Sequence, residues 1–328
     1  MAASMAKLCR EDELVRKISQ GFRGFGDRSI QIGTGDDAAI WEPRKGQETI
    51  LTSDWFLEST HFLREKHPPD SVGWKSLARA VSDVAAMGGT PRCFLLNVAL
   101  PSASDRGWLD DFLGGLRRAS RVLRCSLAGG DTTRQDRILI NITVIGEVVA
   151  GQAVLRSGAR KGNMLFVSGT LGEAELGLRQ LRKSRGKVRA TNAPLSKHLY
   201  PEPRVALGKW LAKNRLVTAM MDISDGLSTD LARLCEASGV GALIEESALP
   251  ISQGVRRSEA LRFALHGGDD YELLFTASPT QANRLRTNYR GLPITCIGKI
   301  TTPKKLLLAK NDGRQEVLSP RGWDPFRK

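Results

Sequence analysis

Aspartate residues recur beside glycine or serine at places where an apolar segment ends or a helix is expected to begin. They occur in Gly35-Asp36-Asp37, Thr52-Ser53-Asp54, Ser82-Asp83, Gly129-Gly130-Asp131 and Asp222-Ile223-Ser224-Asp225. The chain has only 4 histidines and no C-x-x-C pair, so it shows no cluster of the histidine and cysteine ligands that softer metals prefer. Oxygen ligands suit Mg²⁺, which keeps some waters and shares its coordination with substrate phosphates. The pattern indicates a magnesium-dependent enzyme that acts on a nucleoside triphosphate.

Several of these carboxylates also have an ordinary structural explanation. Asp36 and Asp37 fit a solvated turn, and Asp54 at the end of a strand fits a cap for the next segment. Asp83 lies roughly 140° from the centre of its helix's core stripe, which alone suggests a solvated side chain. Its own face carries Ser76 and Ala80 rather than lysine and glutamate, so we expect a covered carboxylate that needs a partner. A cation is a good candidate for that partner.

The segment from Met220 to Leu227 is the centre of the interpretation. Asp222 lies near the end of an expected strand, and Ser224 or Asp225 is expected to cap the next helix. A cap accounts for one aspartate but not for two carboxylates and a hydroxyl within four residues. Open α/β sheets bind ligands at the carboxyl ends of their strands, so this segment is predicted to belong to a site.

Two glycine-containing segments could hold an anion. A short strand is expected to end in a turn at Gly129-Gly130-Asp131, where backbone N–H groups could approach a phosphate. A strand at 164–168, a glycine turn and a helix opening at Gly172-Glu173 suit phosphate at a helix N-terminus. No G-x-x-x-x-G-K-[ST] sequence occurs, which excludes P-loop chemistry.

Three further places carry candidate residues. Gly267-Gly268-Asp269-Asp270 repeats the acidic pattern just before a strand. His61 stands alone and is more often structural or exposed than a ligand. Trp323, in a polar C-terminal segment, fits either ordinary packing or a lid over a ligand.

Composition excludes several classes of protein. The chain has 328 residues, of which 41% are hydrophobic and 26% charged, so it can bury a full core and favours two domains. No apolar run is long enough to span a membrane, and the first residues lack the apolar core of a signal peptide. Five widely spaced cysteines indicate reduced thiols and argue against structural zinc. We therefore expect a cytoplasmic location.

The formal net charge of +14 allows two interpretations. A basic surface can be merely solvated, or it can attract polyanions such as nucleotides or nucleic acid. The densest basic segment, 179–189, contains no aromatic residue on which a base could stack. We favour the solvated surface and consider nucleic acid an unlikely partner.

Hydrophobic periodicity predicts two α/β domains, 1–149 and 150–328. In the first we expect helices at 1–20, 71–88 and 104–124 and strands at 29–32, 48–56, 92–100 and 137–149. In the second we expect strands at 164–168, 216–223 and before Thr276, and helices that begin near Gly172, Pro203 and Leu227. Along 48–56, Ile50, Thr52 and Asp54 share one face of the strand, opposite Leu51, Ser53 and Trp55.

With these residues assembled, the chain resembles the thiamine-monophosphate kinase family, in the superfamily of aminoimidazole ribonucleotide synthetase. The resemblance runs nearly end to end and rests on seven motifs in family order: GDDAA at 35–39, TSD at 52–54, SDVAAMGG at 82–89, GGDTTR at 129–134, RSGA at 156–159, DISDGL at 222–227 and GGDDYELLF at 267–275. It implies a two-domain PurM-like α/β fold, with an N-terminal sheet that forms a barrel in a homodimer and a C-terminal α/β sandwich. It also implies Mg²⁺-assisted transfer from ATP to thiamine monophosphate, giving thiamine diphosphate.

The resemblance assigns roles by motif position. The implied Mg²⁺ ligands are Asp37, Thr52, Ser53, Asp54, Asp83, Asp131, Asp222 and Asp225, of which Asp37, Asp83 and Asp225 are the implied catalytic residues. The implied ATP contacts are Gly130, Asp131, Arg156 and Ser224. The implied thiamine-phosphate contacts are His61, Asp269 and Trp323. The family commonly has glutamate where this chain has Asp269, and the shorter side chain leaves room for a water.

The chemistry of the implied substrates suits such residues. A phosphate monoester is largely dianionic at pH 7, because its second pKa is about 6, so the nucleophile needs no general base. Two unit charges about 4 Å apart repel by about 4 kcal/mol at an effective dielectric constant of 20, and cations cancel that repulsion. The alternatives are another ATP-dependent enzyme of the superfamily, of the selenophosphate or aminoimidazole ribonucleotide synthetase type, or a non-catalytic basic nucleic-acid-binding protein. Cys9 lies ahead of the glycine-rich stretch where selenophosphate synthetases usually carry a reactive residue.

Overall fold

The computed structural model describes residues 11–22, 24, 26–34, 36–101 and 106–326. Residues 1–10 of the first expected helix, Cys9 among them, lie outside the described residues, as do Gly35 of the first acidic motif and 104–105 of the helix expected at 104–124. The chain divides into two compact units. The first comprises 1–84, 90–150 and 181–189, and the second comprises 85–89, 151–180 and 190–328.

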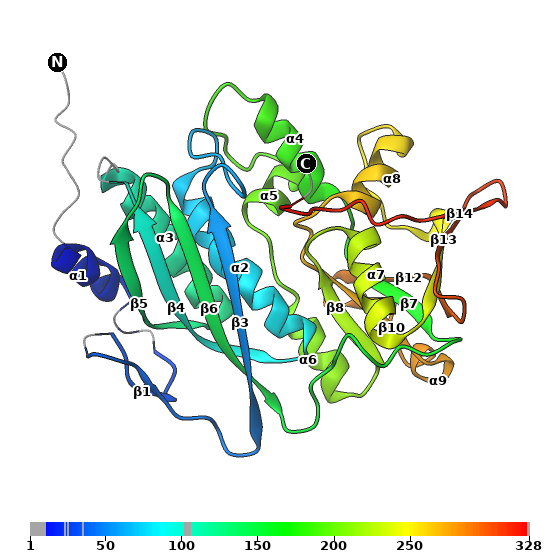
Figure 1. Cartoon of the computed structure of the whole chain (residues 1–328), viewed down its shortest axis with the longest axis horizontal. Coiled ribbons are helices and arrows are strands. Elements are labelled where there is room, and N and C mark those ends of the chain that lie inside the picture. The colour runs from blue at the N-terminus through cyan, green and yellow to red at the C-terminus, as the bar shows by residue number, and fades with distance from the viewer. Residues whose placement is uncertain (1–10, 23, 25, 35, 102–105, 327–328) are drawn as a thin grey trace. The chain divides into compact units, whose positions relative to one another are not determined.

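The first unit is built on a four-stranded sheet (Figure 1). Its elements are α1 (Glu11–Gly21), β1 (Ile30–Ile32), β2 (Ile40–Trp41), β3 (Gln47–Leu57), α2 (Pro69–Ala86), β4 (Thr90–Leu100), α3 (Arg106–Leu123), β5 (Ser126–Arg134) and β6 (Leu139–Val149). The strand order is β3-β6-β4-β5, with β4 and β5 parallel and the other pairs antiparallel. Strands β1 and β2 form a separate two-stranded sheet.

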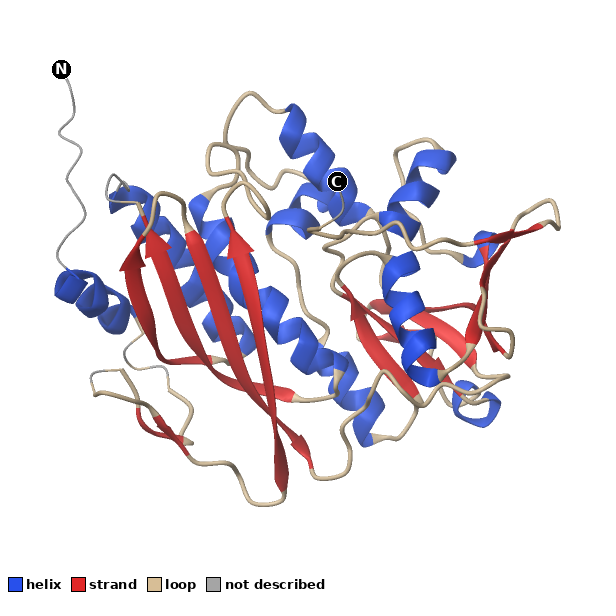
Figure 2. Cartoon of the chain, viewed as in Figure 1, coloured by secondary structure: helices blue, strands red, loops and turns tan. Residues whose placement is uncertain are grey.

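Helices α2 and α3 cover one face of this sheet (Figure 2). The predicted core stripe of α2 is confirmed, because Leu77, Val81 and Val84 are completely buried. The two helices approach so closely that a Cβ at Gly115 would lie 1.8 Å from the carbonyl oxygen of Asp70. The alternation predicted along β3 is also confirmed: Ile50 is buried, whereas Leu51 on the opposite face is 69% exposed.

The Gly129–Arg134 motif corrects one prediction about local structure. We expected a strand that ends in a glycine turn, but β5 continues through the motif, and Gly130 and Asp131 pair in parallel register with Leu96 and Asn97 of β4. Gly130 has φ +149°, and a Cβ there would lie 1.8 Å from the carbonyl oxygen of Leu96. The close approach of β4 therefore explains the glycine without an anion-binding turn.

The second unit contains a larger mixed sheet. Its elements are β7 (Met164–Ser168), α4 (Glu173–Lys183, which continues into the first unit), α5 (Ala193–Leu199), α6 (Val205–Lys213), β8 (Ala219–Ile223), α7 (Leu227–Ser238), β9 (Gly241–Glu245), a 3₁₀ turn (Glu246–Ala248), α8 (Arg257–His266), β10 (Glu272–Ala277), α9 (Pro279–Ala282), β11 (Asn288–Tyr289), β12 (Leu292–Thr301), β13 (Leu306–Ala309) and β14 (Gln315–Val317). The strand order is β14-β13-β9-β12-β7-β10-β8, with β11 paired to β12.

Successive residues of the central strands pack into two different hydrophobic cores, one on each face of this sheet. Met221 and Leu274 pack with Leu231 of α7 in one core. Met220 and Phe275 join Leu207 and Leu211 of α6 in the other. Because neighbouring side chains of a strand point to opposite faces, the strands read as continuous apolar runs. The expected strand at 216–223 begins only at Ala219.

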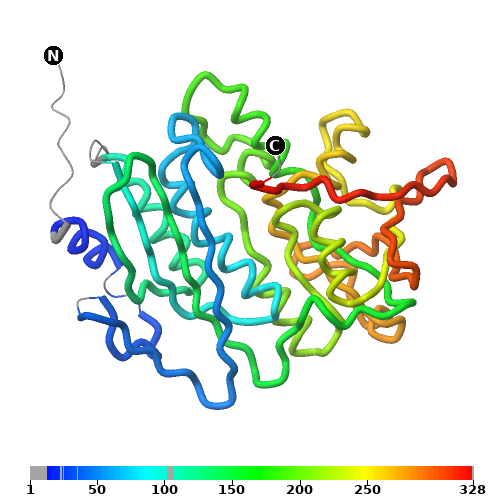
Figure 3. The backbone as a smooth tube through the Cα atoms, viewed as in Figure 1, coloured from blue at the N-terminus to red at the C-terminus, as the bar shows by residue number. Residues whose placement is uncertain are grey.

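The C-terminal segment runs back across the second unit (Figure 3). Gly322 N–H donates to Thr229 Oγ1 of α7 at 2.9 Å, and Trp323 N–H donates to the carbonyl oxygen of Asp225 at 2.8 Å. The segment thereby brings Trp323 to the loop that precedes α7. Among the helices of the described residues, none is long and apolar enough to cross a membrane.

Candidate functional site

The loop between β8 and α7 is held by one carboxylate from within the helix. Asp230 Oδ2 accepts the backbone N–H groups of Ser224, Asp225 and Gly226 at 3.1, 3.0 and 3.0 Å. The helix N-cap is Gly226, which makes no side-chain cap, so the prediction that Ser224 or Asp225 caps α7 is wrong. Burial, and then the neighbouring Asp225 carboxylate, raise the pKa of Asp230 to about 7. The loop's shape therefore depends on Asp230, and the side chains of Ser224 and Asp225 are not used as caps.

Asp225 shares an arginine with Asp230. Arg233 Nη1 lies 2.5 Å from Asp225 Oδ2 and 2.9 Å from Asp230 Oδ1. Partial burial acts to lower the pKa of Arg233, but the hydrogen bonds to these two aspartates and their charges raise it overall. Asp222, at the end of β8, is 3% exposed. Arg233 thus holds the Asp225 carboxylate in place.

The acidic segment before β10 packs directly against this loop. Asp269 N–H donates to the carbonyl oxygen of Ser224 and Tyr271 N–H to that of Ile223, both at 2.8 Å. Trp323 reaches the carbonyl oxygen of Asp225 from the C-terminal segment and is 44% exposed. The second unit therefore brings together Ser224, Asp225, Asp269 and Trp323, which come from three separate parts of the sequence.

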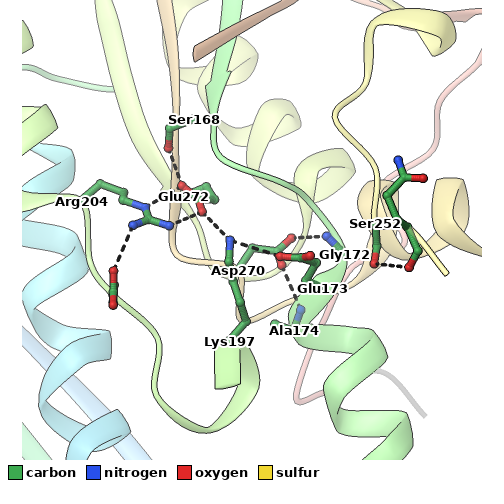
Figure 4. A network of polar contacts seen from close by, with 11 residues as sticks. Ser168, Gly172, Glu173, Ala174, Lys197, Arg204, Ser252, Asp270 and Glu272 are labelled. Carbon is green, nitrogen blue, oxygen red and sulfur yellow. Dashed lines mark hydrogen bonds and ion pairs between the residues drawn. The ribbon is translucent and has the colours of Figure 1, made fainter. Parts of the chain in front are cut away.

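A buried ionic network lies on the inner side of the same acidic segment (Figure 4). Glu272 is fully buried and accepts from Arg204 at 2.6 and 2.7 Å, from Lys197 at 2.9 Å and from Ser168 Oγ at 2.6 Å. Burial alone would raise the pKa of Glu272, but the bonds from Arg204 and the charge of Lys197 hold it below its usual value. The network joins β7, β10, α5 and the start of α6.

Asp270 serves as the cap of α4. Its carboxylate accepts the N–H groups of Gly172 at 2.7 Å and Ala174 at 3.3 Å. Burial raises the pKa of Asp270 to about 7, against the opposing effects of the Gly172 N–H and the Lys197 charge. The strand, glycine turn and helix expected at 164–173 are present. The helix N-terminus that we considered for phosphate is occupied by a carboxylate of the chain itself.

In the first unit, β3 and α2 contribute a second group of candidate residues. Thr52 Oγ1 donates to Asp83 Oδ2 at 2.5 Å. Arg79 Nη2 lies 3.8 Å from Asp54 Oδ1. The face of α2 around Asp83 is covered, as predicted, since Ser76 is 1% exposed. The structure therefore brings Thr52, Asp54 and Asp83 to the contact between β3 and α2.

Ser53 and Asp131 lie elsewhere in the same unit. Ser53 Oγ accepts from Asn141 Nδ2 at 3.0 Å and lies 3.1 Å from Thr143 Oγ1, on the face of the sheet opposite Thr52. Asp131 is exposed and stands in register with Asn97, whose amide reaches Asn141 at 3.3 Å. The side chain of Ser53 is thus not turned toward Asp83.

The three remaining candidates take part in other contacts. Asp37 is exposed, and its N–H donates to Asp36 Oδ1 at 2.9 Å. His61 Nδ1 accepts the Leu57 N–H at 3.0 Å just after β3. Arg156 is exposed, and its carbonyl oxygen accepts from Ser238 Oγ at 3.0 Å. Over the part of the chain that is described, no three His, Cys, Asp or Glu side chains are arranged to hold a metal ion.

Comparison with known proteins gives the family. Models for AIR synthase related protein match residues 35–148 (N-terminal domain) and 160–308 (C-terminal domain). Thiamine-monophosphate kinase of Bacillus subtilis is 34% identical over 327 residues, covering 97% of this chain and 99% of the relative. The Escherichia coli K12 protein of that name is 35% identical, covering 97% and 98%. The chain belongs to the thiamine-monophosphate kinase family.

Solved structures confirm the fold expected for a thiamine-monophosphate kinase. The Stenotrophomonas maltophilia K279a kinase has a TM-score of 0.79 at 34% identity, covering 94% of this chain and 98% of that one. AaThiL, complexed with AMPPCP and TMP, has a TM-score of 0.74 at 32% identity, covering 95% and 96%. The hydrogenase maturation protein HypE with ATP has a TM-score of 0.76 at 20% identity, which shows only the shared fold. The two-domain PurM-like fold is confirmed.

Several residues that shape the candidate site of this kinase were not identified from the sequence. The sequence analysis assigned no role to Asp230, Arg233, Lys197 or Arg204. It included Glu272 only as part of the GGDDYELLF motif, without a role of its own. Asp230 carried a usable signal, since an acidic side chain in the first turn of a helix can reach back to backbone N–H groups that precede the helix. The partners of Glu272 come from distant segments and carry no comparable local signal.

Proposed function

We propose that the protein transfers the γ-phosphoryl group of ATP to thiamine monophosphate, giving thiamine diphosphate and ADP. The observation that carries this proposal is the likeness to thiamine-monophosphate kinases along almost the whole chain, at 34% identity to the Bacillus subtilis protein. AaThiL supports the substrates, because its structure contains TMP together with AMPPCP, in which a methylene group replaces the β–γ bridging oxygen of ATP.

Transfer is proposed to be direct and in line. The acceptor phosphate is already largely ionised at neutral pH, so the protein need not remove a proton from it. The task of the residues is to hold two polyanions in reactive geometry. For ATP we propose Gly130, Asp131, Arg156 and Ser224, and for thiamine monophosphate His61, Asp269 and Trp323. The positively charged thiazolium ring suits the Asp269 carboxylate and the exposed face of Trp323.

Mg²⁺ is the proposed metal, and the donor chemistry fits it. Both groups of candidate residues offer hydroxyl and carboxylate oxygens, and the hydroxyl of Thr52 already lies against Asp83. When bound, Mg²⁺ would neutralise phosphate charge between donor and acceptor. The residues proposed to hold it are Asp37, Thr52, Ser53, Asp54, Asp83, Asp131, Asp222 and Asp225. The catalytic residues proposed among them are Asp37, Asp83 and Asp225.

We propose a homodimer formed through the open face of the first unit's sheet. The face opposite α2 and α3 exposes Leu51 by 69%, Trp55 by 55% and Val149 by 45%. Leu51 and Trp55 lie on β3 and Val149 on the neighbouring β6, and large apolar side chains exposed on one face favour a protein interface. Two such sheets facing each other would form the barrel that the resemblance implies.

The domain boundaries and the contacts that each domain makes also remain proposals. We propose that residues 1–149 supply metal, ATP and dimer contacts, and that residues 150–328 supply nucleotide and substrate contacts. A cytoplasmic location, which the cysteine content favours, stays a prediction in the same way.

The decisive experiment is an assay of thiamine diphosphate formation by the purified protein. We expect product from ATP and thiamine monophosphate with Mg²⁺, and none when EDTA replaces Mg²⁺. ATP consumption with selenide or with formylglycinamidine ribonucleotide, and not with thiamine monophosphate, would instead favour a synthetase of the superfamily. Absence of thiamine diphosphate under all metal conditions would overturn the proposal.

A further inference from the structure

Asp269 is held in an unusual backbone conformation. Its φ is +69°, and that of Tyr271 is +50°, a region that residues other than glycine adopt uncommonly. Backbone hydrogen bonds from both residues to Ile223 and Ser224 keep the segment there. Such conformations persist where the surroundings determine them, and they gather at ligand sites. The backbone of this segment therefore presents Asp269 in one defined direction.

Tyr271 holds one oxygen of the Asp269 carboxylate. Its hydroxyl donates to Asp269 Oδ1 at 2.9 Å. The tyrosine as a whole is 2% exposed, so its ring is fixed by packing and its hydroxyl has little freedom to move away. A hydrogen bond to a charged acceptor is stronger than one between neutral groups, so this contact constrains the carboxylate effectively.

His198 of α5 faces the other oxygen. Its Nδ1 lies 3.9 Å from Asp269 Oδ2, a distance at which a charge or a bridging water acts but a direct hydrogen bond does not. The histidine is 1% exposed, whereas the Asp269 side chain keeps 27% of its surface exposed. The carboxylate is thus held on its protein side and open on its solvent side.

The buried network fixes both groups relative to each other. Lys197, next to His198 in α5, binds Glu272 at 2.9 Å, and Glu272 follows Tyr271 directly. Asp270, between Asp269 and Tyr271, caps α4 through Gly172. Asp270 and Glu272 therefore anchor the chain on each side of Tyr271 in the sequence. Through Lys197, Glu272 also ties α5 to this segment (Figure 4). The network therefore links α5, which carries His198, to the segment that carries Asp269.

We propose that Tyr271 and His198 are positioning residues that hold the Asp269 carboxylate ready for the positive ring of the substrate. This inference rests on the proposed function, in which Asp269 meets the thiazolium of thiamine monophosphate. A carboxylate fixed before binding loses little freedom when the substrate arrives, which strengthens binding without any new contact. Aspartate suits this arrangement, because its short side chain keeps the carboxylate within reach of the hydroxyl two residues later.

The main test is Tyr271→Phe, which removes only the hydroxyl. We expect KM and the calorimetric Kd for thiamine monophosphate to rise about ten-fold, the loss expected for one hydrogen bond to a charged group. The kcat, the KM for ATP and the melting temperature should stay near those of the wild type. Tyr289→Phe, which alters a tyrosine packed on Trp210 elsewhere in the same unit, is the matched control.

A double-variant cycle separates positioning from general packing. In an Asp269→Asn background, where the charge is already lost, Tyr271→Phe should weaken binding by less than two-fold. His198→Ala should weaken thiamine monophosphate binding in the same selective way. His198→Asn, which keeps a polar group near the position of Nδ1, should restore part of it.

The outcomes separate this inference from the function on which it rests. If the wild type does not bind thiamine monophosphate, the proposed function fails and the inference fails with it. If the wild type binds but Tyr271→Phe binds equally tightly, only the inference is overturned. An equal rise in the KM for both substrates, or an undiminished Tyr271→Phe effect in the Asp269→Asn background, would show a merely structural role and would also overturn it.

Discussion

Acidic side chains serve three different purposes in the described residues. Asp230 and Asp270 are buried acceptors of backbone N–H groups, and they shape the loops that carry the candidate site. Glu272 is a buried partner of arginine and lysine. Asp37 and Asp131 are exposed. Asp131 and Asp270 both come within two residues after a pair of glycines, yet one is exposed and the other is a buried acceptor, so the surroundings decide which carboxylate has which role.

Asp270 gives a prediction about pH. Its pKa is about 7 in the folded protein and about 3.8 when unfolded. As pH rises from about 4 to 7 the unfolded chain releases this proton while the folded one keeps it, so the free energy of unfolding falls. For a shift of this size the loss is at most about 4 kcal/mol and is complete above pH 7. Asp270→Asn should remove this component, which urea unfolding of both proteins between pH 4.5 and 8 would measure. Parallel pH profiles for the two proteins would contradict the prediction.

Asp83 gives a prediction about turnover. We expect Asp83→Asn to lower kcat by about two orders of magnitude or more, because it removes a charge that would balance cations between two polyanions. The melting temperature should change little, since asparagine can still accept from Thr52. Asp111→Asn, at an exposed position of α3, serves as the control. A near-normal rate of Asp83→Asn at saturating Mg²⁺ would remove Asp83 from the ligand set.

At the scale of elements, the buried network joins α5, α6, β7 and β10. Four donated hydrogen bonds converge on one carboxylate that has no access to solvent. A buried ion pair adds little compared with an apolar pair of the same shape, but a single unpaired member is costly. We therefore infer that this network mainly fixes how these four elements pack against one another.

Removing one member of the network should be strongly destabilising. Arg204→Met leaves Glu272 buried with only Lys197 as a charged partner, and we expect a loss of about 3–5 kcal/mol in the free energy of unfolding. The double variant Arg204→Met/Glu272→Met should recover a substantial part of it. Denaturant unfolding curves of the three proteins provide the measurement. A single variant as stable as the wild type would show that Glu272 does not need Arg204.

At the scale of the whole molecule, each unit buries its own core and leaves a specific surface exposed. The first unit covers one face of its sheet with α2 and α3 (Figure 2). Leu51 and Trp55 are exposed on the other face. The second unit covers both faces of its central strands. A half-covered sheet that exposes large apolar side chains on its open face is the arrangement expected of an interface.

The open face leads to a prediction about assembly. Leu51→Asp together with Trp55→Asp should convert a dimer into a monomer, raising the dimer Kd at least about a hundred-fold, because both charges would be buried without partners. Sedimentation equilibrium measures this directly. Val317→Asp, at an equally exposed apolar position of β14, should leave the assembly unchanged. A double variant that remains dimeric would place the interface elsewhere.

The sequence by itself determined the family, the main elements and the regular part of the core. Periodicity located α2 and α7, and alternation assigned Ile50 and Leu51 to opposite faces of β3. The order of seven acidic and glycine-rich motifs identified the family before any contact was known. These features are readable because each depends on residues that are close along the chain. The short helix α5 was missed although Asn192 and Pro194 mark its start by ordinary cap chemistry.

Only the tertiary structure decided what each polar residue does. It placed Gly130 inside a strand, because β4 passes too close for a side chain, and it made Asp230 rather than Ser224 or Asp225 the acceptor for the loop. It also placed Tyr271 and His198 at Asp269. These roles depend on strand register and on contacts between residues far apart in the chain, and a linear pattern of residue types does not contain that information.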